Sequence, residues 1–441
     1  MPKLKDLQDR VDDYVLCLRR RGMDSFVDEF QDGLSSYDSW RKLTHKIGEL
    51  RAEANKLSKL YGKNQDESLL DKSRDIRKEI ASTEQEAAAL ESLINSIELR
   101  LPNWLSSDAG SVDEVIEYRC PARVYSSDLP QFLVDHGNAT PIEVTTKRFS
   151  HYDLVGTLVD QETAGKVAQS RFYYELDELV LLDMALSMYA IEFFRERGYG
   201  GRLMITPYML RKEVESRICY FEAFKDTIFE VEKDGLVLLP SSEHSIVAFY
   251  LDKIFKEGEL PLRILAWSPC FRREAGAHGK ETRGIFRVRQ FHKAEIHAIV
   301  EKGEDAAELE KMRQDIQDFL ESMNLPNRSI IVSAPDMDKR AVKQIDIETW
   351  MPAQGKFAET HSIATLGTWV SEKGAIRYKD GKRNVPATNL YATAVAVQRM
   401  ICAVCENCFD PTDSVIIVPE VLRKYMMGVD TISVSSNLPQ S

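Results

Sequence analysis

The sequence contains no apolar run that approaches the roughly 18 residues needed to cross a membrane. Its N-terminal stretch, MPKLKDLQDRVDDYVLCLRRRG, mixes acids and bases and lacks the apolar core of a secretory signal, and its acids argue against a transit peptide. Cysteine is scarce, with seven residues, an odd number scattered along the chain. This pattern indicates reduced thiols rather than a disulfide framework. We therefore expect a cytoplasmic protein with no membrane association.

An excess of positive charge is also missing, since the formal net charge is −12. Any binding of nucleic acid must then come from local basic patches and not from the overall field. No Walker A motif and no dinucleotide-binding fingerprint is present. The 441 residues are enough for two or three domains with a large core.

The most informative stretch present is Cys270–His297, CFRREAGAHGKETRGIFRVRQFHKAEIH. Strand-like alternation, LRILAWSPCFRRE and IFRVRQFHKAEIHAIV, flanks a glycine-rich turn with Gly276, Gly279 and Gly284, which predicts a long antiparallel hairpin. Such a hairpin could grip polyphosphate, because guanidinium groups bind phosphate bidentately. The alternative is a surface hairpin whose charges face water. The arginines concerned are Arg263, Arg272, Arg273, Arg283, Arg287 and Arg289.

A helical arm is predicted near the N-terminus. After one or two short helices that end near Gly33, apolar residues alternate at spacings of three and four along two stretches separated by Gly62–Asn64, the pattern of a coiled coil. We expect two helices of about 26 and 35 residues and an arm of roughly 40–50 Å. On its own such an arm could equally be a dimerisation or spacer hairpin. The two seams are Trp40, Leu43, Ile47, Leu50, Ala54, Leu57 and Tyr61, then Ile76, Ile80, Thr83, Ala87, Leu90, Ile94, Ile97 and Leu101.

The rest of the chain predicts an α+β domain, an antiparallel sheet flanked by helices. Residues 102–150, rich in Ser, Asp and Pro, suggest a linker. A helix is expected over 176–197, ending at Gly198, followed by a strand at 203–205 and Pro207. Further strands surround a second helix over about 305–323.

The order FRREAG–x–x–G–x–x–TRGIFRVRQFHKAE closely resembles motif 2 of class II aminoacyl-tRNA synthetases, in the form found in archaeal-type seryl-tRNA synthetases. The resemblance extends from about Leu34 to Tyr425. It implies a class II synthetase-like antiparallel sheet with an N-terminal coiled-coil arm, divided into 1–103 (arm), 104–149 (lead-in) and 150–441 (catalytic domain). The helix, strand and proline around 176–207 resemble motif 1, the dimer interface, so a homodimer is expected.

By the same resemblance the arm would bind tRNA, and LRAEANKLSK is similar to the family's sequence at that place. Candidate phosphate contacts are basic residues of the first arm helix, because phosphate contacts supply much of the affinity for nucleic acid. They are Arg41, Lys42, Lys46, Arg51, Lys56, Lys59 and Lys63.

The resemblance also implies an ATP site, in which cations and a metal neutralise charge while the amino-acid carboxylate attacks the α-phosphate. Arg272 would contact the α-phosphate and Arg399 of motif 3 the γ-phosphate side. Glu274 would recognise adenine, Arg287 would hold the phosphate tail, and Phe291 would stack on the ring. A carboxylate beside a hydroxyl suits Mg²⁺, and the residues implied are Glu359 and Ser362 of FAETHS.

The amino-acid pocket matches the family less well. PSSEHS resembles the family's P-T-x-E-H segment, so Ser241 and Glu243 would bind the substrate ammonium, Glu295 would hold serine, and Thr393 would lie near its side chain. Tyr391 stands where asparagine is usual. Gln169 and Arg289 likewise replace a usual glycine and histidine.

The block after Ser362 also departs from the family, since residues 363–373 read IATLGTWVSEK in place of a Cys-, Asn- and Asp-rich run. Losing polar groups that read a substrate hydroxyl relaxes or redirects specificity. The expected activity is an ATP-dependent seryl-tRNA synthetase-like ligase that forms an aminoacyl adenylate and charges tRNA. Two alternatives stay open, a paralogue that activates another amino acid for a biosynthetic pathway, and an inactive protein that binds tRNA or a partner.

One further cluster, Cys402, Cys405 and Cys408, has C-x-x-C-x-x-C spacing on a predicted helix. A soft-metal site would need a fourth ligand and usually a loop. Buried core thiols are therefore the preferred interpretation.

Overall fold

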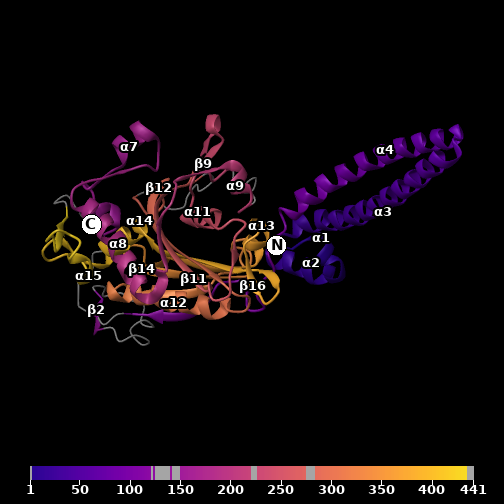
Figure 1. The fold of residues 1–441 in the computed structure, drawn as a ribbon. Coiled ribbons are helices and arrows are strands. Elements are labelled where there is room, and N and C mark those ends of the chain that lie inside the picture. Colours follow the sequence, from indigo (N-terminus) through magenta and orange to yellow (C-terminus); the bar gives the residue numbers. More distant parts are fainter. Residues whose placement is uncertain are drawn as a thin grey trace. The chain divides into compact units, whose positions relative to one another are not determined.

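The computed structural model describes residues 2–120, 123–124, 140–141, 149–219, 226–274 and 284–434 (Figure 1). The chain forms two compact units, Met1–Trp104 and Leu105–Ser441. Over the residues described, none of the helices combines the length and the apolar character required to span a bilayer.

The first unit is a helical arm on a small helical base. α1 (Leu4–Leu7), η1 (Gln8–Arg10), α2 (Val11–Arg20) and η2 (Asp24–Phe26) precede α3 (Val27–Asn64) and α4 (Glu67–Glu98). α3 and α4 lie against each other as a hairpin (Figure 1). The chain reverses at Gln65, which has a positive φ of 54°, and the Asp66 side chain then caps α4 by accepting from the backbone N–H of Ser68.

The predicted helix end near Gly33 is wrong, because α3 continues through this residue without a break. A Cβ at Gly33 would lie 3.1 Å from the Ile97 side chain and 3.2 Å from Leu4. This glycine therefore permits close packing of α3 on its neighbours and does not end the helix.

The predicted coiled-coil seam is confirmed. Every apolar position assigned to it is buried or half-buried, and the positions between are mostly exposed. Two ion pairs link the helices outside the seam, Lys46 with Glu79 at 2.7 Å and Arg51 with Glu84 at 2.6 Å. These two basic residues are thus already paired with acids of α4.

The second unit is built on an eight-stranded sheet, which confirms the expected α+β class. Its strand order is β1-β13-β14-β15-β18-β12-β11-β6, and all neighbours are antiparallel except β11 and β6. The strands are β1 (Glu114–Arg119), β6 (Arg202–Ile205), β11 (Leu262–Phe271), β12 (Gln290–Val300), β13 (Asn327–Ile331), β14 (Lys343–Met351), β15 (Lys356–Gly367) and β18 (Thr388–Ala396).

Three helices pack on this sheet and form the main core with it. They are α8 (Glu178–Phe194), α12 (Asp305–Ser322) and α14 (Val397–Asn407). α12 packs on β15 and β18, and α8 on β12 and β18. As the sequence predicts, α8 ends close to Gly198, which has a φ of 89°, and β6 follows.

The remaining elements are short. They are β2 (Arg123–Val124), β3 (Thr140–Pro141), α6 (His151–Leu154), β4 (Val159–Asp160), α7 (Gln161–Ala168), β5 (Tyr174–Glu175), η3 (Arg195–Tyr199), β7 (Met209–Arg211), α9 (Lys212–Ser216), β8 (Glu230–Val231), η4 (Glu232–Asp234), β9 (Leu236–Leu238), α11 (Ser242–Phe249), β10 (Ile254–Phe255), α13 (Trp369–Gly374), β16 (Arg377–Asp380), β17 (Arg383–Pro386), β19 (Phe409–Asp410), β20 (Val415–Ile417), α15 (Glu420–Arg423) and β21 (Thr431–Ser433).

The predicted hairpin forms from β11 and β12, but its second strand is shorter than expected. Residues 284–289 lie outside any strand, and the turn residues Gly276, Gly279 and Arg283 lie outside the described part of the chain. Gly284 has a φ of 74°, and a Cβ there would lie only 2.1 Å from Nε2 of His151. Both the positive φ and the nearby His151 ring therefore require glycine at this position.

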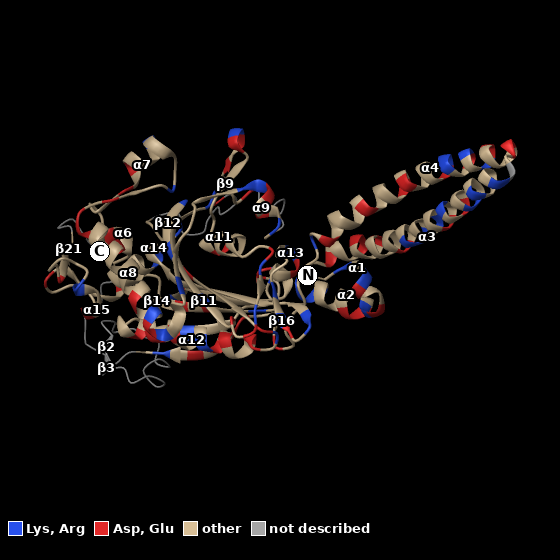
Figure 2. Cartoon of the chain, viewed as in Figure 1, with Lys and Arg blue, Asp and Glu red and all other residues tan. Residues whose placement is uncertain are grey.

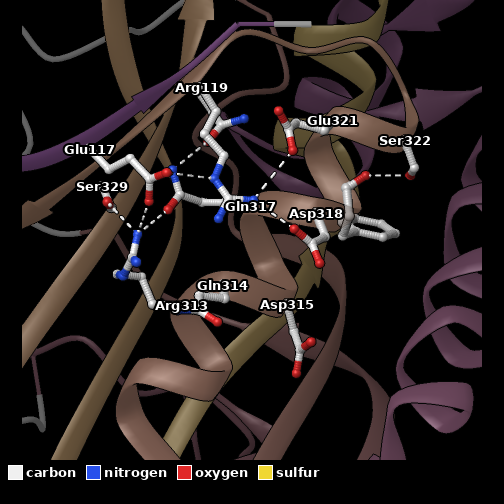
Figure 3. Close-up of polar contacts among 12 residues, drawn as sticks. Glu117, Arg119, Arg313, Gln314, Asp315, Gln317, Asp318, Glu321, Ser322 and Ser329 are labelled. Atoms are coloured by element: carbon white, nitrogen blue, oxygen red, sulfur yellow. Dashed lines mark hydrogen bonds and ion pairs between the residues drawn. The ribbon is translucent and has the colours of Figure 1, made fainter.

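Part of the range for which the sequence predicts a lead-in contributes β1, the outer strand of the sheet. Figure 3 shows how charged side chains attach β1 to α12 and β13. Arg313, almost fully buried, donates to Glu117 at 2.5 Å and to Ser329 Oγ at 3.3 Å, and Arg119 donates to Asp318 at 2.6 Å. The carboxylates of Glu117 and Asp318 are 39% and 42% exposed, so solvent weakens both ion pairs, and the network supplements the strand pairing that holds β1 on β13.

Candidate active site

A cavity of about 400 Å³ lies over the strands that the predicted site residues occupy. It brings together every predicted residue except Glu295, which lies just beneath the lining and contacts Ser241. The predicted members of the lining are Ser241, Glu243, Arg272, Glu274, Arg287, Phe291, Glu359, Ser362, Tyr391, Thr393 and Arg399.

Arg272 and Phe291 form one wall of the cavity. Arg272 follows the last residue of β11, and its Nε donates to the carbonyl oxygen of Pro240 at 3.3 Å. Its guanidinium carbon lies 5.3 Å from the centre of the Phe291 ring, on β12. A planar cation beside an aromatic face can bind a phosphate next to a stacked base.

Glu274 and Arg287 face each other across the start of the hairpin turn. Nε of Arg287 donates to Glu274 Oε2 at 2.5 Å, and Arg171 lies 4.0 Å from the same oxygen. Glu274 has a φ of 49°, an uncommon conformation for a residue other than glycine. The carboxylate is thereby held at the edge of the cavity between two cations.

Glu359 and Ser362 form an acidic corner of the cavity, and Asp346, which the sequence did not indicate as a site residue, lies beside them. Arg399 pairs with Glu359 Oε1 at 3.0 Å and donates to the Glu359 carbonyl at 2.7 Å. Burial alone would raise the pKa of Glu359, but Arg399 lowers it below its usual value. Asp346 has its pKa raised, first by burial and then by the Glu359 carboxylate.

The oxygens of this corner suit a hard divalent cation. The Glu359 side chain is 47% exposed toward the cavity, and Ser362 Oγ shares the amide donor of Gln344 with Asp346, each at 3.1 Å. Two carboxylates and a hydroxyl in one place fit the oxygen ligands that Mg²⁺ prefers. Asp346 lies opposite Ser362 in the register of β14 and β15, a pairing that the sequence alone does not indicate.

The other end of the cavity begins at the N-terminus of α11. Ser241 is the N-cap and accepts from the Glu243 N–H at 3.2 Å, which points the first turn of the helix at the cavity. Glu243 pairs with Arg340 at 2.9 Å, a partner that no pattern in the sequence indicates. Burial raises the pKa of Glu243, but Arg340 together with His244 and His297 lowers it, and the net direction is down.

Glu295 is fully buried below this end of the cavity. One of its oxygens pairs with Lys293, and Ser241 donates to the same oxygen at 3.4 Å. Oε1 has no hydrogen-bond partner among the described residues. Burial raises the pKa of Glu295 to about 7, against the opposing effect of Lys293. Thr393 lies directly opposite on β18, so both side chains face the same side of the sheet.

Tyr391 and the block of residues 363–373 differ from the family pattern at this end of the cavity. The Tyr391 hydroxyl lies 3.5 Å from Asp338 Oδ2. Ile363, Ala364 and Leu366 of the block are fully buried in β15. The block therefore contributes apolar core where polar groups were expected in the family, and Asp338 and Arg340 supply polar groups from another segment.

Two other groups of residues do not form part of the lining. His361 lies in the core beside Phe319 of α12, with a ring-centre distance of 6.2 Å, and burial lowers its pKa to about 3. Cys402, Cys405 and Cys408 are buried; all seven cysteines fall in the described ranges, and none forms a disulfide. Burial raises the pKa of Cys408 to about 12, as expected for core thiols.

Glu215, Cys219 and His244 form a buried group behind the cavity whose residue types could hold a metal ion. His244 Nδ1 lies 2.5 Å from Glu215 Oε1, and the Cys219 thiol donates to the same oxygen at 3.2 Å. Two ligands of a tetrahedral zinc ion, each about 2 Å from the metal, stand more than 3 Å apart. The geometry is that of a hydrogen-bonded ion pair.

On the arm, three of the predicted basic residues differ from the others. Lys56, Lys59 and Lys63 line a shallow groove on α3, near the turn, together with Leu60. Figure 2 shows basic residues along the part of α3 that leads to the turn. Arg41 lies 3.7 Å from Asp38, and Lys46 and Arg51 pair with α4 as described above. The groove therefore presents a local basic patch on an acidic protein.

Comparisons with known proteins agree with these features. Residues 1–105 match the seryl-tRNA synthetase N-terminal domain, and residues 227–408 match the tRNA synthetase class II core domain (G, H, P, S and T). The chain is 34% identical to the serine–tRNA ligase of Hyperthermus butylicus over 96% of this chain and 95% of that protein. It is 33% identical to that of Picrophilus torridus over 93% and 94% of the two chains.

Solved structures give the same result. The seryl-tRNA synthetase of Pyrococcus horikoshii complexed with ATP superposes with a TM-score of 0.90 at 34% identity, covering 99% of this chain and 100% of that chain. The cytoplasmic serine–tRNA ligase of Naegleria fowleri in complex with AMP gives a TM-score of 0.81 at 26% identity, covering 97% and 96%. The chain belongs to the serine–tRNA ligase family of class II aminoacyl-tRNA synthetases.

Proposed function

We propose that this protein activates serine with ATP and transfers the seryl group from the adenylate to tRNA. One observation carries the proposal: a single cavity joins an arginine-rich end, suited to a polyphosphate, to an end lined by carboxylates, suited to an ammonium group. The names of the relatives support serine as the amino acid and support the ligase over an inactive binding protein or a repurposed enzyme.

In the proposed reaction the serine carboxylate attacks the α-phosphate and pyrophosphate leaves. The protein needs little acid–base chemistry for this step, because its task is to hold the reactants in line and neutralise developing charge. Arg272 would contact the α-phosphate and Arg399 the γ-phosphate side. Phe291 would stack on adenine, and Glu274, held between Arg287 and Arg171, would accept a hydrogen bond from the adenine amino group.

The acidic corner of Glu359, Ser362 and Asp346 would hold Mg²⁺. When bound, the ion supplies charge neutralisation to phosphate oxygens. Arg399 pairs with Oε1 of Glu359 and keeps this carboxylate ionised.

The test is ATP–pyrophosphate exchange with each amino acid in turn, followed by charging of serine tRNA. Serine-dependent exchange that disappears in Arg272→Ala is the expected result. Exchange that another amino acid supports better than serine would refute serine as the substrate. Absence of exchange with every amino acid would refute the ligase activity.

We also propose that the protein is a homodimer. β6 is the edge strand opposite β1, and its Ile205 is 73% exposed. On α8, which precedes β6 in the chain, Met184 and Met188 lie one turn apart and are 56% and 51% exposed. Apolar residues on an unpaired edge strand are suited to pairing with a second copy. Sedimentation should show a dimer that Ile205→Asp dissociates, whereas Val112→Asp, at an equally exposed position elsewhere, leaves it intact.

The arm is proposed to bind tRNA through the Lys56, Lys59 and Lys63 patch.

The protein is proposed to act in the cytoplasm. The absence of disulfides among seven cysteines, all described, supports a reducing compartment. Fractionation of the source cells would test the location.

A further inference from the structure

Arg340 places a cation inside the pocket proposed for the amino acid. It lies between β13 and β14, and its side chain is only 8% exposed. Nη1 donates to one oxygen of Glu243 at 2.9 Å, and Nη2 lies 3.4 Å from the other. On its other side the guanidinium contacts Asp338, with an Nη2–Oδ2 distance of 2.7 Å. Both oxygens of Glu243 are therefore engaged by this one side chain.

The pairing matters because an amino acid also brings a cation to the pocket. A buried carboxylate binds an ammonium strongly only if its oxygens are available, since an unpaired buried charge is costly and a paired one is already satisfied. Substrate ammonium and the Arg340 guanidinium thus require the same oxygens of Glu243. The Tyr391 ring, 6.0 Å from the Arg340 guanidinium carbon, and its hydroxyl beside Asp338 form the wall behind the ion pair.

The formal charges at this end of the cavity also favour binding of one ammonium group. Three carboxylates, Glu243, Asp338 and Glu295, meet two cations, Arg340 and Lys293, at this end of the cavity. When all five are ionised the sum is −1, which one substrate ammonium neutralises. Glu295 Oε1 is buried and has no hydrogen-bond partner in the described part of the chain.

We propose that Arg340 is a specificity-determining residue that competes with the α-ammonium group of the substrate for Glu243 and directs this group to Glu295. The proposal rests on the proposed function, because it concerns the amino acid that the ligase activates. Binding of the ammonium group to Glu243 is then limited to the fraction of molecules in which Arg340 has moved off this carboxylate, and in the other molecules Glu295 is its partner.

The experiment measures KM for serine in pyrophosphate exchange for the full-length protein and a set of variants. Arg340→Gln combined with Asp338→Asn removes one charge of each sign, so the pocket keeps its net charge while Glu243 loses its internal partner. If the open form is a tenth of the population or less, KM for serine should fall about tenfold or more. Adding Glu243→Gln to this pair should abolish the gain.

Arg340→Lys provides the conservative control, because it retains the cation and should keep KM for serine much closer to that of the wild type. The KM for ATP is the internal reference, and thermal unfolding of each variant reports folding. A residue with only a structural role would raise KM or leave it unchanged when replaced, and either result for the Arg340→Gln/Asp338→Asn protein overturns the proposal.

The outcomes also separate this proposal from the proposed function. Serine exchange in the wild type with no fall of KM in the double variant refutes only the role of Arg340. No serine exchange in the wild type, but exchange in the double variant, supports the role of Arg340 and refutes serine as the natural substrate. No exchange in either protein refutes both. If the double variant does not fold, single Arg340→Gln is measured with the same criteria.

Discussion

Activation of serine should increase with pH through about 7, because the proposed ammonium partner Glu295 titrates there. Its side chain is fully buried, and burial raises its pKa to about 7 although Lys293 opposes the shift. Only the ionised carboxylate attracts an ammonium group, which itself stays charged over this range. The protonated fraction of the enzyme therefore binds serine poorly.

The size of the effect follows from the titration of one group. With a pKa of about 7, about a tenth of Glu295 is ionised at pH 6 and about nine tenths at pH 8. The kcat/KM for serine should therefore rise about eight- to tenfold between these values. In Glu295→Gln it should be low and independent of pH in this window.

The assay is pyrophosphate exchange at saturating ATP and magnesium, from pH 6 to pH 8.5, with serine varied at each pH. Saturating ATP removes the contribution of nucleotide binding, and the KM for ATP measured in parallel detects any titration at the other end of the cavity. A wild-type profile that is flat across the window, or a rise that persists in Glu295→Gln, would contradict the assignment.

The pH dependence of folding stability provides an independent test of the Glu295 pKa. Stability should fall with rising pH over the range in which activity rises. The folded pKa of Glu295 lies above its ordinary value of 4.5, so its contribution to stability is complete below pH 4.5 and is lost as the pH rises to 7. At about 1.4 kcal/mol for each pH unit, the loss is about 3 kcal/mol. Glu295→Gln lacks this loss, so urea unfolding should show its stability, relative to the wild type, improving by about that amount from pH 5 to pH 8.

Three further predictions concern other parts of the molecule. Arg399→Ala should lower kcat for exchange about 100- to 1,000-fold at saturating ATP, with Arg399→Lys retaining part of the activity; equal losses in both would show that charge is not what matters. Replacing Lys56, Lys59 and Lys63 together by alanine should raise KM for tRNA and reduce the log–log salt dependence by roughly two to three, and a change in tRNA-independent exchange would contradict a role confined to the arm. Gln169→Gly should raise the stability by about 1 kcal/mol in thermal unfolding, because Gln169 has a φ of 85° and a ψ of 174°, a region that suits glycine; a fall in Tm would mean that its hydrogen bond with Arg289 matters more.

The arm and the hairpin could be predicted because their patterns are local. A seam that repeats every three and four residues fixes which faces of α3 and α4 meet, whatever the rest of the chain does. The end of the first helix was predicted wrongly for the opposite reason. Gly33 indicates a break when only its neighbours in sequence are known, and the side chains that require a glycine there, Leu4 and Ile97, are distant in sequence.

The residues proposed for the ATP end could be named because the resemblance assigns them from short motifs around β11 and β12, on β15 and on α14. Lys293 was missed although a signal existed, because it is two residues from Glu295 on the same face of β12. Asp346 was missed because its pairing with Ser362 depends on the register of β14 and β15, which only the structure shows. Arg340 carried no such signal, because it belongs to a segment between strands and meets Glu243 only after the sheet has formed.

The position of Arg340 relative to the charge that moves in the reaction explains why it should affect binding and not the chemical step. Serine, the proposed substrate, would enter with one charge of each sign, and only its carboxylate charge would change when the adenylate forms. That charge passes to the phosphate end, where Arg272 and Arg399 line the cavity. The ammonium charge is the same in the ground state and the transition state, so a cation that opposes it there is felt equally in both. Replacing Arg340 should therefore change KM for serine, whereas replacing Arg399 should change kcat, and the two ends of one cavity can be separated by these two measurements.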